Sequence, residues 1–308
     1  MFIAHDIEIS KNGEKYRLSD NPYTGQKLEV IEYDAQGAKK ELDFNGIERI
    51  NGRFLNSSVE KFKKVNMVLR YDVSKIAYVA HLKNSIQNLF SGQFYLRELA
   101  TNDTEIPFQT MFDPTHKFEL NYVDGKQLLV TLVSNVSFDT TKTTGVINLE
   151  FETVELPYYE SIGYSTDLEN QNNLDIWGIN SEMSFFSNSD KRKFTFYNTD
   201  NDFVYYAGDV PINQYNQKLI VEITIGENTK HFTFDTGYKS EMMTVKNIDL
   251  KEGDVIKYDG LQTYKNGIPI NGLKYGTGNQ PSLSPGYNQF HFNQVVKKVS
   301  FKFKMYYR

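Results

Sequence analysis

The chain has 308 residues, of which 39% are hydrophobic and 24% charged, so it is long enough for two domains with cores that need no disulfides. This composition excludes collagen-like, low-complexity and wholly disordered chains. The net charge of −5 disfavours nucleic-acid binding, and the absence of cysteine excludes disulfide frameworks, cysteine nucleophiles and zinc sites built on thiolates.

Aromatic residues make up 14% of the chain, with 22 Phe and 21 Tyr against a single Trp, and this favours β structure. The first twenty residues alternate polar and apolar side chains and lack the apolar stretch of a signal peptide. The apolar segment Leu128–Val133 is too short to cross a bilayer. We therefore expect a soluble protein that is made without an export signal and does not insert into membranes.

The chain opens with the pattern of a β-hairpin. Ile7 and Ile9 alternate with polar residues, and Asn12-Gly13 then supplies the positive φ angles of a tight turn. Further turns are expected at Asn45-Gly46 and Asn51-Gly52.

One helix is expected, at about residues 73–90, after a short strand at 66–71. Its apolar residues recur at spacings of three and four at Ile76, Val79, Leu82 (or Lys83), Ile86 and Leu89. Asp72 or Ser74 is expected to cap its start, and Gly92 to end it. Because only one face is apolar, the helix is expected to pack on a sheet.

Two strands are expected at 128–138 and 146–156, joined by a turn at 140–145. In the second strand Ile147, Leu149 and Phe151 share one face, while Asn148, Glu150 and Glu152 share the other. This alternation is typical of a sheet with one face in water.

The segment 156–173 contains Pro157 and Gly163 and ends in polar residues, so we place the domain boundary there. The first domain is expected at 1–156, a linker at 157–170 and the second domain at 171–308.

The second half reads as strands and turns only, which predicts a β-sandwich or jelly roll. Strands are expected at 194–197, 203–206, 219–225, 231–234 and 255–258, with turns at 226–228, 259–260, 266–267 and 271–272. A last strand places Val299, Phe301, Phe303 and Met305 on one face. The predicted fold class is mainly β: an N-terminal β-rich domain with one α-helix, and a C-terminal β-sandwich.

The sequence contains no motif of nucleotide binding, metal binding or nucleophilic catalysis. The histidines His5, His81, His116, His231 and His291 are scattered singly, without a partner at metal-ligand spacing. His81 is expected to be a half-buried helix residue. No cofactor, metal or catalytic residue is assigned, and the residues of any binding site stay unknown.

Two groups of acidic residues could form a functional site or could simply be exposed polar residues. Glu150 and Glu152 would lie about 7 Å apart on one strand, as in a glycosidase site, but Asn148 continues the same polar row, which favours a solvated sheet face. Asn198, Asp200 and Asp202 could offer oxygens to calcium, yet the turn glycine and bidentate Glu of such loops are missing, which favours a polar turn.

The end of the chain is basic, with no acidic residue after Asp259. An acidic partner is one explanation, and protection of an edge strand by lysines is the favoured one. The basic residues are Lys265, Lys274, Lys297, Lys298, Lys302, Lys304 and Arg308. Trp177 with Phe185 and Phe186 could stack on a sugar, although aromatics this abundant are mostly core residues.

Three segments in order resemble one family, the distal tail proteins of siphophages that infect Gram-positive bacteria. The segments are His81–Phe108, Glu152–Glu169 and Asn266–Phe292, and the closing FKFKMYYR also fits. The third segment carries a glycine turn followed by Leu283, Pro285, Gly286 and Asn288 before the final strand. The resemblance touches both halves of the chain.

The resemblance implies a non-enzymatic component of the virion, at the tail tip or baseplate, made in the host cytoplasm. The N-terminal domain of the family forms a homohexameric hub ring that joins the tail tube to the tail-associated lysin or tip protein. Its C-terminal domain is a galectin-like β-sandwich that anchors receptor-binding proteins.

Two other functions stay open. A galectin-like sandwich could bind host cell-wall glycans directly, although no cluster of His, Asn, Arg and Glu is evident around Trp177, and Arg192 is the only Arg of the second half before Arg308. A glycoside hydrolase would use Glu150 and Glu152.

Overall fold

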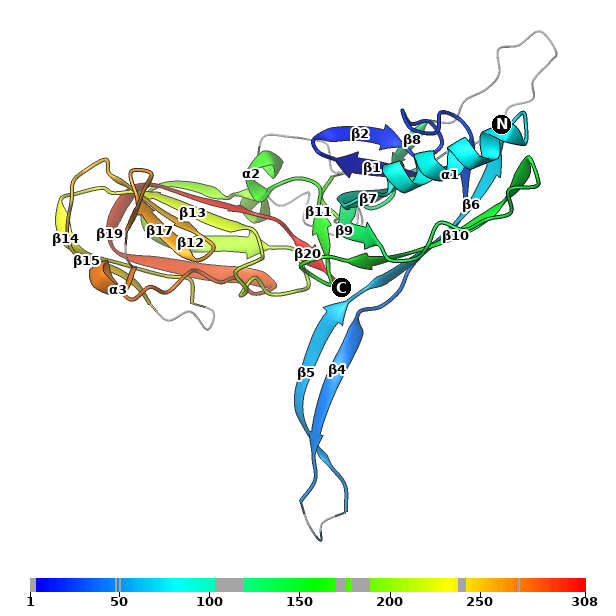
Figure 1. The fold of residues 1–308 in the computed structure, drawn as a ribbon. Helices are drawn as coiled ribbons and strands as arrows, with labels where there is room; N and C mark the ends of the chain where they lie inside the picture. Colours follow the sequence, from blue (N-terminus) through cyan, green and yellow to red (C-terminus); the bar gives the residue numbers. More distant parts are fainter. Residues whose placement is uncertain are drawn as a thin grey trace. The chain divides into compact units, whose positions relative to one another are not determined.

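The computed structural model describes residues 4–47, 49, 51–102, 119–169, 176–178, 189–237, 242–270 and 272–308. The chain divides into two compact units, residues 1–159 with Arg308, and residues 160–307. Both units consist mainly of antiparallel strands, which confirms the predicted fold class (Figure 1). No helix in the described ranges has the length and apolar character needed to cross a membrane.

The first unit contains a curved antiparallel sheet, with β8 (Leu120–Tyr122) pairing beside β7. Its main path is β2 (Glu14–Arg17), β1 (His5–Lys11), β7 (Gln93–Thr101), β9 (Lys126–Leu132), β10 (Thr144–Thr153), β6 (Lys64–Asp72) and β3 (Leu28–Ala35). The turn between β1 and β2 has positive φ at both Asn12 (53°) and Gly13 (84°), which confirms the predicted hairpin.

The predicted helix exists as α1 (Ala77–Leu89), but it begins later than expected. Neither Asp72 nor Ser74 caps it; Ile76 precedes its first turn without a side-chain cap. The reason is that strand pairing continues to Val73, whose backbone N–H donates to the carbonyl of Thr143 at 2.9 Å. The backbone here is held extended, so the helix cannot start until the chain has left the sheet.

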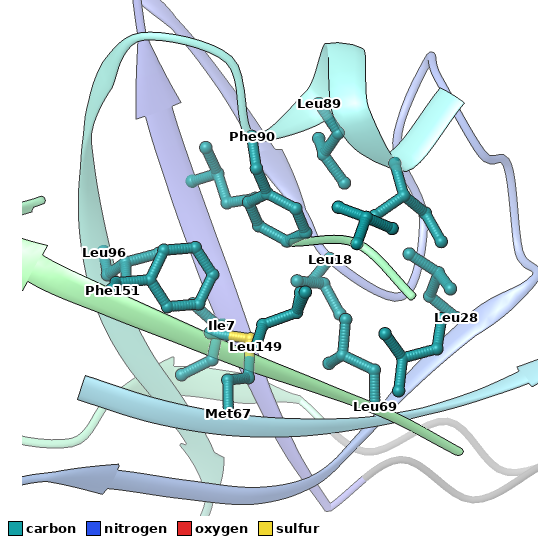
Figure 2. Packing of buried hydrophobic residues seen from close by; sticks show 14 of the residues in the cluster. Ile7, Leu18, Leu28, Met67, Leu69, Leu89, Phe90, Leu96, Leu149 and Phe151 are labelled. Carbon is teal, nitrogen blue, oxygen red and sulfur yellow. The ribbon is translucent and has the colours of Figure 1, made fainter. Parts of the chain in front are cut away.

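The helix packs one apolar face onto the sheet. Val79, Leu82, Ile86 and Leu89 are buried, whereas His81 is exposed and not half-buried as predicted. Figure 2 shows Leu89 and Phe90 above inward-facing residues of β1, β6 and β10, including Ile7, Met67, Leu149 and Phe151. Each of these strands buries alternate residues, as the period-2 pattern of the sequence requires.

Between β3 and β6 the chain leaves the sheet as a separate two-stranded hairpin, β4 (Lys39–Asn45) and β5 (Phe54–Phe62). Figure 1 shows this hairpin, hereafter the arm, extending away from the sheet that carries it. The Asn-Gly pairs at 45–46 and 51–52 predicted turns near its tip, but no sequence pattern predicted the arm itself.

The second unit is built around β19 (Gly286–Phe303), along one side of which β12 (Thr195–Tyr206) runs. The path of strands is β15 (Met243–Leu250), β14 (Thr229–Asp235), β19, β13 (Leu219–Thr224), β16 (Val255–Asp259), β17 (Gln262–Lys265) and β18 (Ile268–Ile270). The remaining elements are α2 (Ser165–Leu168), η1 (Ser189–Arg192), α3 (Gly272–Tyr275) and the pair β11 (Tyr159–Ser161) with β20 (Tyr306–Tyr307).

A single strand belongs to two layers of this unit. The ring centroids of Phe290 and Phe301 lie 5.0 Å apart, although both residues belong to β19. An extended strand would separate them by roughly 37 Å at about 3.4 Å per residue. β19 therefore bends back over itself, pairing with β14 before the bend and with β13 after it, and the unit is a two-layered β-sandwich, as predicted.

The strand β12 follows this bend and corrects one expectation. The sequence predicted two strands at 194–197 and 203–206 with a polar turn between them, but the structure has one strand with a β-bulge between Thr199 and Asn201. Because β12 pairs with β19 on both sides of the bend, β12 must bend as well, and a β-bulge permits this. At the end of β19 and just beyond, Val299, Phe301, Phe303 and Met305 are all fully buried, which confirms their shared face.

Candidate interaction surfaces

Trp177 is not available to a sugar. Its side chain is fully buried, and its ring packs on Gly163, where an added Cβ would lie 2.6 Å from the ring. The hydroxyl of Tyr307 donates to the Trp177 carbonyl at 2.8 Å. The predicted neighbours Phe185 and Phe186 lie outside the described residues. The idea of sugar stacking by Trp177 is therefore wrong.

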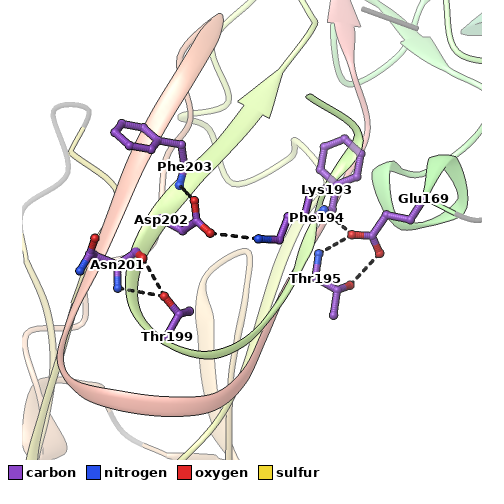
Figure 3. Close-up of polar contacts among 8 residues, drawn as sticks. All are labelled: Glu169, Lys193, Phe194, Thr195, Thr199, Asn201, Asp202 and Phe203. Carbon is purple, nitrogen blue, oxygen red and sulfur yellow. Dashed lines mark hydrogen bonds and ion pairs between the residues drawn. The ribbon is translucent and has the colours of Figure 1, made fainter. Parts of the chain in front are cut away.

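The two carboxylates proposed for calcium are both engaged by neighbouring groups of the chain. Asp202 accepts from Lys193 Nζ at 3.1 Å and from the backbone N–H of Phe203 (Figure 3). Asp200 accepts from the side chain of Asn201 at 2.7 Å. Within the ranges that the structure describes, no group of three or more His, Asp or Glu side chains could hold a metal ion. The bulge of β12 is held by hydrogen bonds between Thr199 and Asn201, and Figure 3 also shows the Glu169 carboxylate accepting from Phe194 and Thr195 at the start of the same strand.

Glu150 and Glu152 lie on the solvent face of β10, as the alternation predicted. Their cross-strand neighbours are Asn66 and Lys64 on β6. Glu150 is exposed on an open sheet face, which gives a substrate no enclosed site at this pair.

The described histidines lie on different elements, His5 on β1, His81 on α1, His231 on β14 and His291 on β19. His5 contacts Glu98 through Nε2 at 2.8 Å, and His291 Nδ1 lies 3.8 Å from a carboxylate oxygen of Asp235. His81 and His231 are exposed, and His116 lies outside the described residues.

The basic C-terminal segment is largely paired within the chain. Lys265 contacts Asp254 at 3.1 Å, and Lys297 contacts Glu252 at 2.7 Å. Lys304 is buried and donates to the carbonyl of Ser161 at 2.9 Å, so it neither guards an edge strand nor meets a partner in solution. Lys302 lies 4.7 Å from the ring of Tyr164. This distribution weakens the idea of an acidic polymer bound along the last strand.

The arm exposes large apolar side chains that nothing in its own unit covers. Their exposed fractions run from 47% to 58%, and the residues are Leu42, Ile47, Phe54, Leu55 and Val59. The charged residues of the arm already pair across its two strands: Lys61 contacts Glu41 at 2.7 Å and Lys40 contacts Glu60 at 3.8 Å. The surface that the arm leaves available for another molecule is therefore mainly apolar.

A second exposed surface lies on the outward face of the β12–β19 pair. Phe203 and Tyr287 expose 49% and 54% of their surface, and the rings of Tyr205 and Tyr287 lie 5.0 Å apart. Alternate residues of β12, such as Val204 and Tyr206, point into the core. We call the set Phe203, Tyr205 and Tyr287 the aromatic platform. The segment FVYY (203–206) could have indicated this surface. All four of its residues are apolar or aromatic, although a strand with one buried face needs an apolar residue only at every second position.

A groove of about 490 Å³ lies beside β17 and β18, lined by uncharged residues that include Leu261, Gln262, Leu273 and Gln280. The amide of Gln280 donates to the Thr263 hydroxyl at 3.2 Å, and its other end, Oε1, is buried without a hydrogen-bond partner.

The comparisons with known proteins gave matches among solved structures only. No protein-family model and no curated protein matches the chain. The crystal structure of the SPP1 Dit (gp 19.1) protein, described as a paradigm of the hub adsorption apparatus in Gram-positive-infecting phages, covers 97% of this chain and 99% of its own, with a TM-score of 0.59 and 8% identity. Structures of the phage P2 baseplate in its activated conformation with Ca and with Sr match at a TM-score of 0.42 and 10% identity, over 97–98% of both chains. The SPP1 match confirms that the chain has the fold that the sequence resemblance implied.

Proposed function

We propose that this protein is a structural component of a phage tail tip, forming a hub ring that joins the tail tube to the tip protein below it and anchors receptor-binding proteins. The observation that carries the proposal is the fold shared with the SPP1 hub protein over nearly the whole length of both chains. The ring is proposed to be a homohexamer, and the protein to reside in the virion after synthesis in the host cytoplasm.

The arm supports self-association. A two-stranded hairpin is at best marginally stable in water, and one with five half-exposed large apolar residues gains stability when another surface covers it. In a closed ring each copy offers the same surfaces to its neighbours, so each arm would find a copy of the same receiving surface. We propose that the arm contacts an adjacent copy of this chain.

The test is the mass of the purified protein by light scattering, followed by negative-stain imaging of the same fraction. We expect a hexamer and a ring with a central channel. Leu42→Lys combined with Leu55→Lys is expected to shift the population to monomers that remain folded, because both side chains are already half in water.

The matched control is Leu261→Lys combined with Leu273→Lys, which adds the same two charges at exposed leucines of the second unit and is expected to leave the ring intact. A wild-type protein that stays monomeric at its solubility limit, and that does not assemble with tail tube and tip proteins, would contradict the hub.

We also propose that the protein has no catalytic activity. A hydrolase using Glu150 and Glu152 would release reducing sugar from purified cell walls, and Glu150→Gln would abolish that release. We expect no release by the wild-type protein above a buffer control.

A further inference from the structure

The outward face of the β12–β19 pair combines an aromatic surface with hydrogen-bonding side chains. Phe203 lies opposite Gln289, Tyr205 opposite Tyr287, and Asn201 opposite His291, so all six side chains share one face. His291 also lies opposite Asp235 of β14, which brings a carboxylate to the same face. The ring of Tyr287 meets Phe203 edge to face at 6.4 Å between centroids and Tyr205 edge to face at 5.0 Å, so the three rings form one contiguous aromatic cluster.

The needs of the fold do not fully explain this platform. Cross-strand aromatic pairing accounts for Tyr205 and Tyr287. Phe203, however, faces an amide and leaves half of its surface in water, where a polar residue would serve the sheet equally well. An exposed aromatic group of this kind, bordered by polar side chains, marks a ligand-binding surface.

The charges around the platform are balanced. Lys193 pairs with Asp202 at 3.1 Å, His291 lies beside Asp235, and Lys191 lies 5.0 Å from the centre of the Tyr205 ring. The face therefore has no strong field of either sign, which disfavours a polyanion and favours an uncharged ligand.

We propose that this face binds a neutral pyranose oligosaccharide. One face of a pyranose ring carries C–H groups that pack on aromatic rings, and its edge carries hydroxyls that need donors and acceptors. The platform supplies the rings, while Gln289, His291 and Asp235 supply the polar partners. This function goes beyond the hub and does not depend on it, since a monomer would carry the same face.

The experiment titrates the full-length protein with chitotetraose, a neutral β-linked oligosaccharide, by isothermal calorimetry and saturation-transfer NMR. We expect saturable binding that is weakened about tenfold or more by Phe203→Ala or Tyr287→Ala, because each removes a stacking surface. Tyr287→Phe retains the ring and is expected to bind within about twofold of wild type.

The matched control is Tyr197→Ala, which removes an equally exposed tyrosine (65%) from the same strand outside the platform and is expected to leave binding unchanged. Thermal melting checks that each variant is folded, and Gln289→Ala, an exposed polar position, provides the same test should an aromatic variant unfold.

Three outcomes would overturn the proposal. The first is that chitotetraose shows no saturable binding. The second is that both platform variants still bind it as the wild type does, which would be expected if the sugar bound in the Gln280 groove. The third is that the protein binds only poly(glycerol phosphate), with an affinity that falls steeply at high salt.

Discussion

Buried tyrosines organise the interior of the second unit. The Tyr206 hydroxyl donates to the carbonyl of Val210 at 2.6 Å and accepts from the backbone N–H of Tyr306 at 3.0 Å. The Tyr306 hydroxyl in turn accepts from the backbone N–H of Lys218 at 2.6 Å. Burial raises the pKa of both hydroxyls far above the ordinary value, so both remain protonated even in alkaline solution. Each ring thus fills the core while its hydroxyl satisfies backbone groups that a phenylalanine would leave unpaired.

Gly163 is a position where the addition of a single methyl group should lower the stability of the fold. Gly163→Ala would place a Cβ 2.6 Å from the fully buried ring of Trp177, which has no room to move away. We expect a loss of about 1–3 kcal/mol in the free energy of unfolding, measured by urea denaturation. Gly37→Ala, where a Cβ meets nothing within 4 Å, is the control and should be neutral or slightly stabilising. Equal effects of the two substitutions would contradict the packing.

Asp254 should make stability depend on pH in the acid range. Hydrogen bonds from the Lys251 backbone and the Asn266 amide, together with Lys265, lower the pKa of its carboxyl to about 2. Because the pKa is lower in the folded state, the stabilisation is complete above the unfolded value near 4 and is lost as the pH falls through about 2. We expect Asp254→Asn to cost about 1–2 kcal/mol at pH 7.

In urea denaturation this difference should shrink between pH 4 and pH 2. Asp249→Asn, at an exposed position of the preceding strand, serves as the control and should not reproduce the pH dependence. A constant difference across that range would rule out the charged carboxylate as the cause.

Among the elements, α1 tests whether one face of a helix holds the first unit together. Ile86 is fully buried and belongs to the main cluster, whereas His81 is exposed on the same helix. We expect Ile86→Ala to cost about 2–5 kcal/mol and His81→Ala less than about 0.5 kcal/mol, both measured by chemical denaturation. A small effect of Ile86→Ala would mean that the helix contributes little to the core.

Local patterns in the sequence predicted the elements whose causes are local. The Asn12-Gly13 and Asn266-Gly267 turns, the apolar face of α1 and the alternation in β10 and β19 follow from φ preferences and side-chain period. The helix start was wrong because pairing of Val73 with a residue seventy positions away overrides a local cap. The bend of β19 and the aromatic platform depend on partners far along the chain, which a single sequence does not reveal.

The arm is the element that sequence reasoning missed most completely. Its strands carry few apolar residues in regular alternation, since neither face is buried in its own unit. Hydrophobic periodicity indicates burial within the chain, and a hairpin whose two faces are both largely exposed carries a weak signal of that kind.

At the scale of the whole molecule, two compact units predict two unfolding events. Differential scanning calorimetry should resolve two transitions, with Ile86→Ala lowering the midpoint of one and Gly163→Ala that of the other. A single transition that both substitutions shift equally would show that the units unfold cooperatively.

The bent strand β19 also dictates an order of events during synthesis. The first unit has nearly all of its sheet once Thr153 has left the ribosome, whereas both layers of the second unit await residues 286–303. Until then, aromatic-rich strands such as β12 lack the neighbour that pairs with them, because the paired residues are separated by 80 (Tyr206 and Gly286) to 105 (Thr195 and Ser300) positions of the chain. The strand that joins the two layers therefore also sets a period of synthesis in which the unfinished second unit exposes apolar surface that favours aggregation.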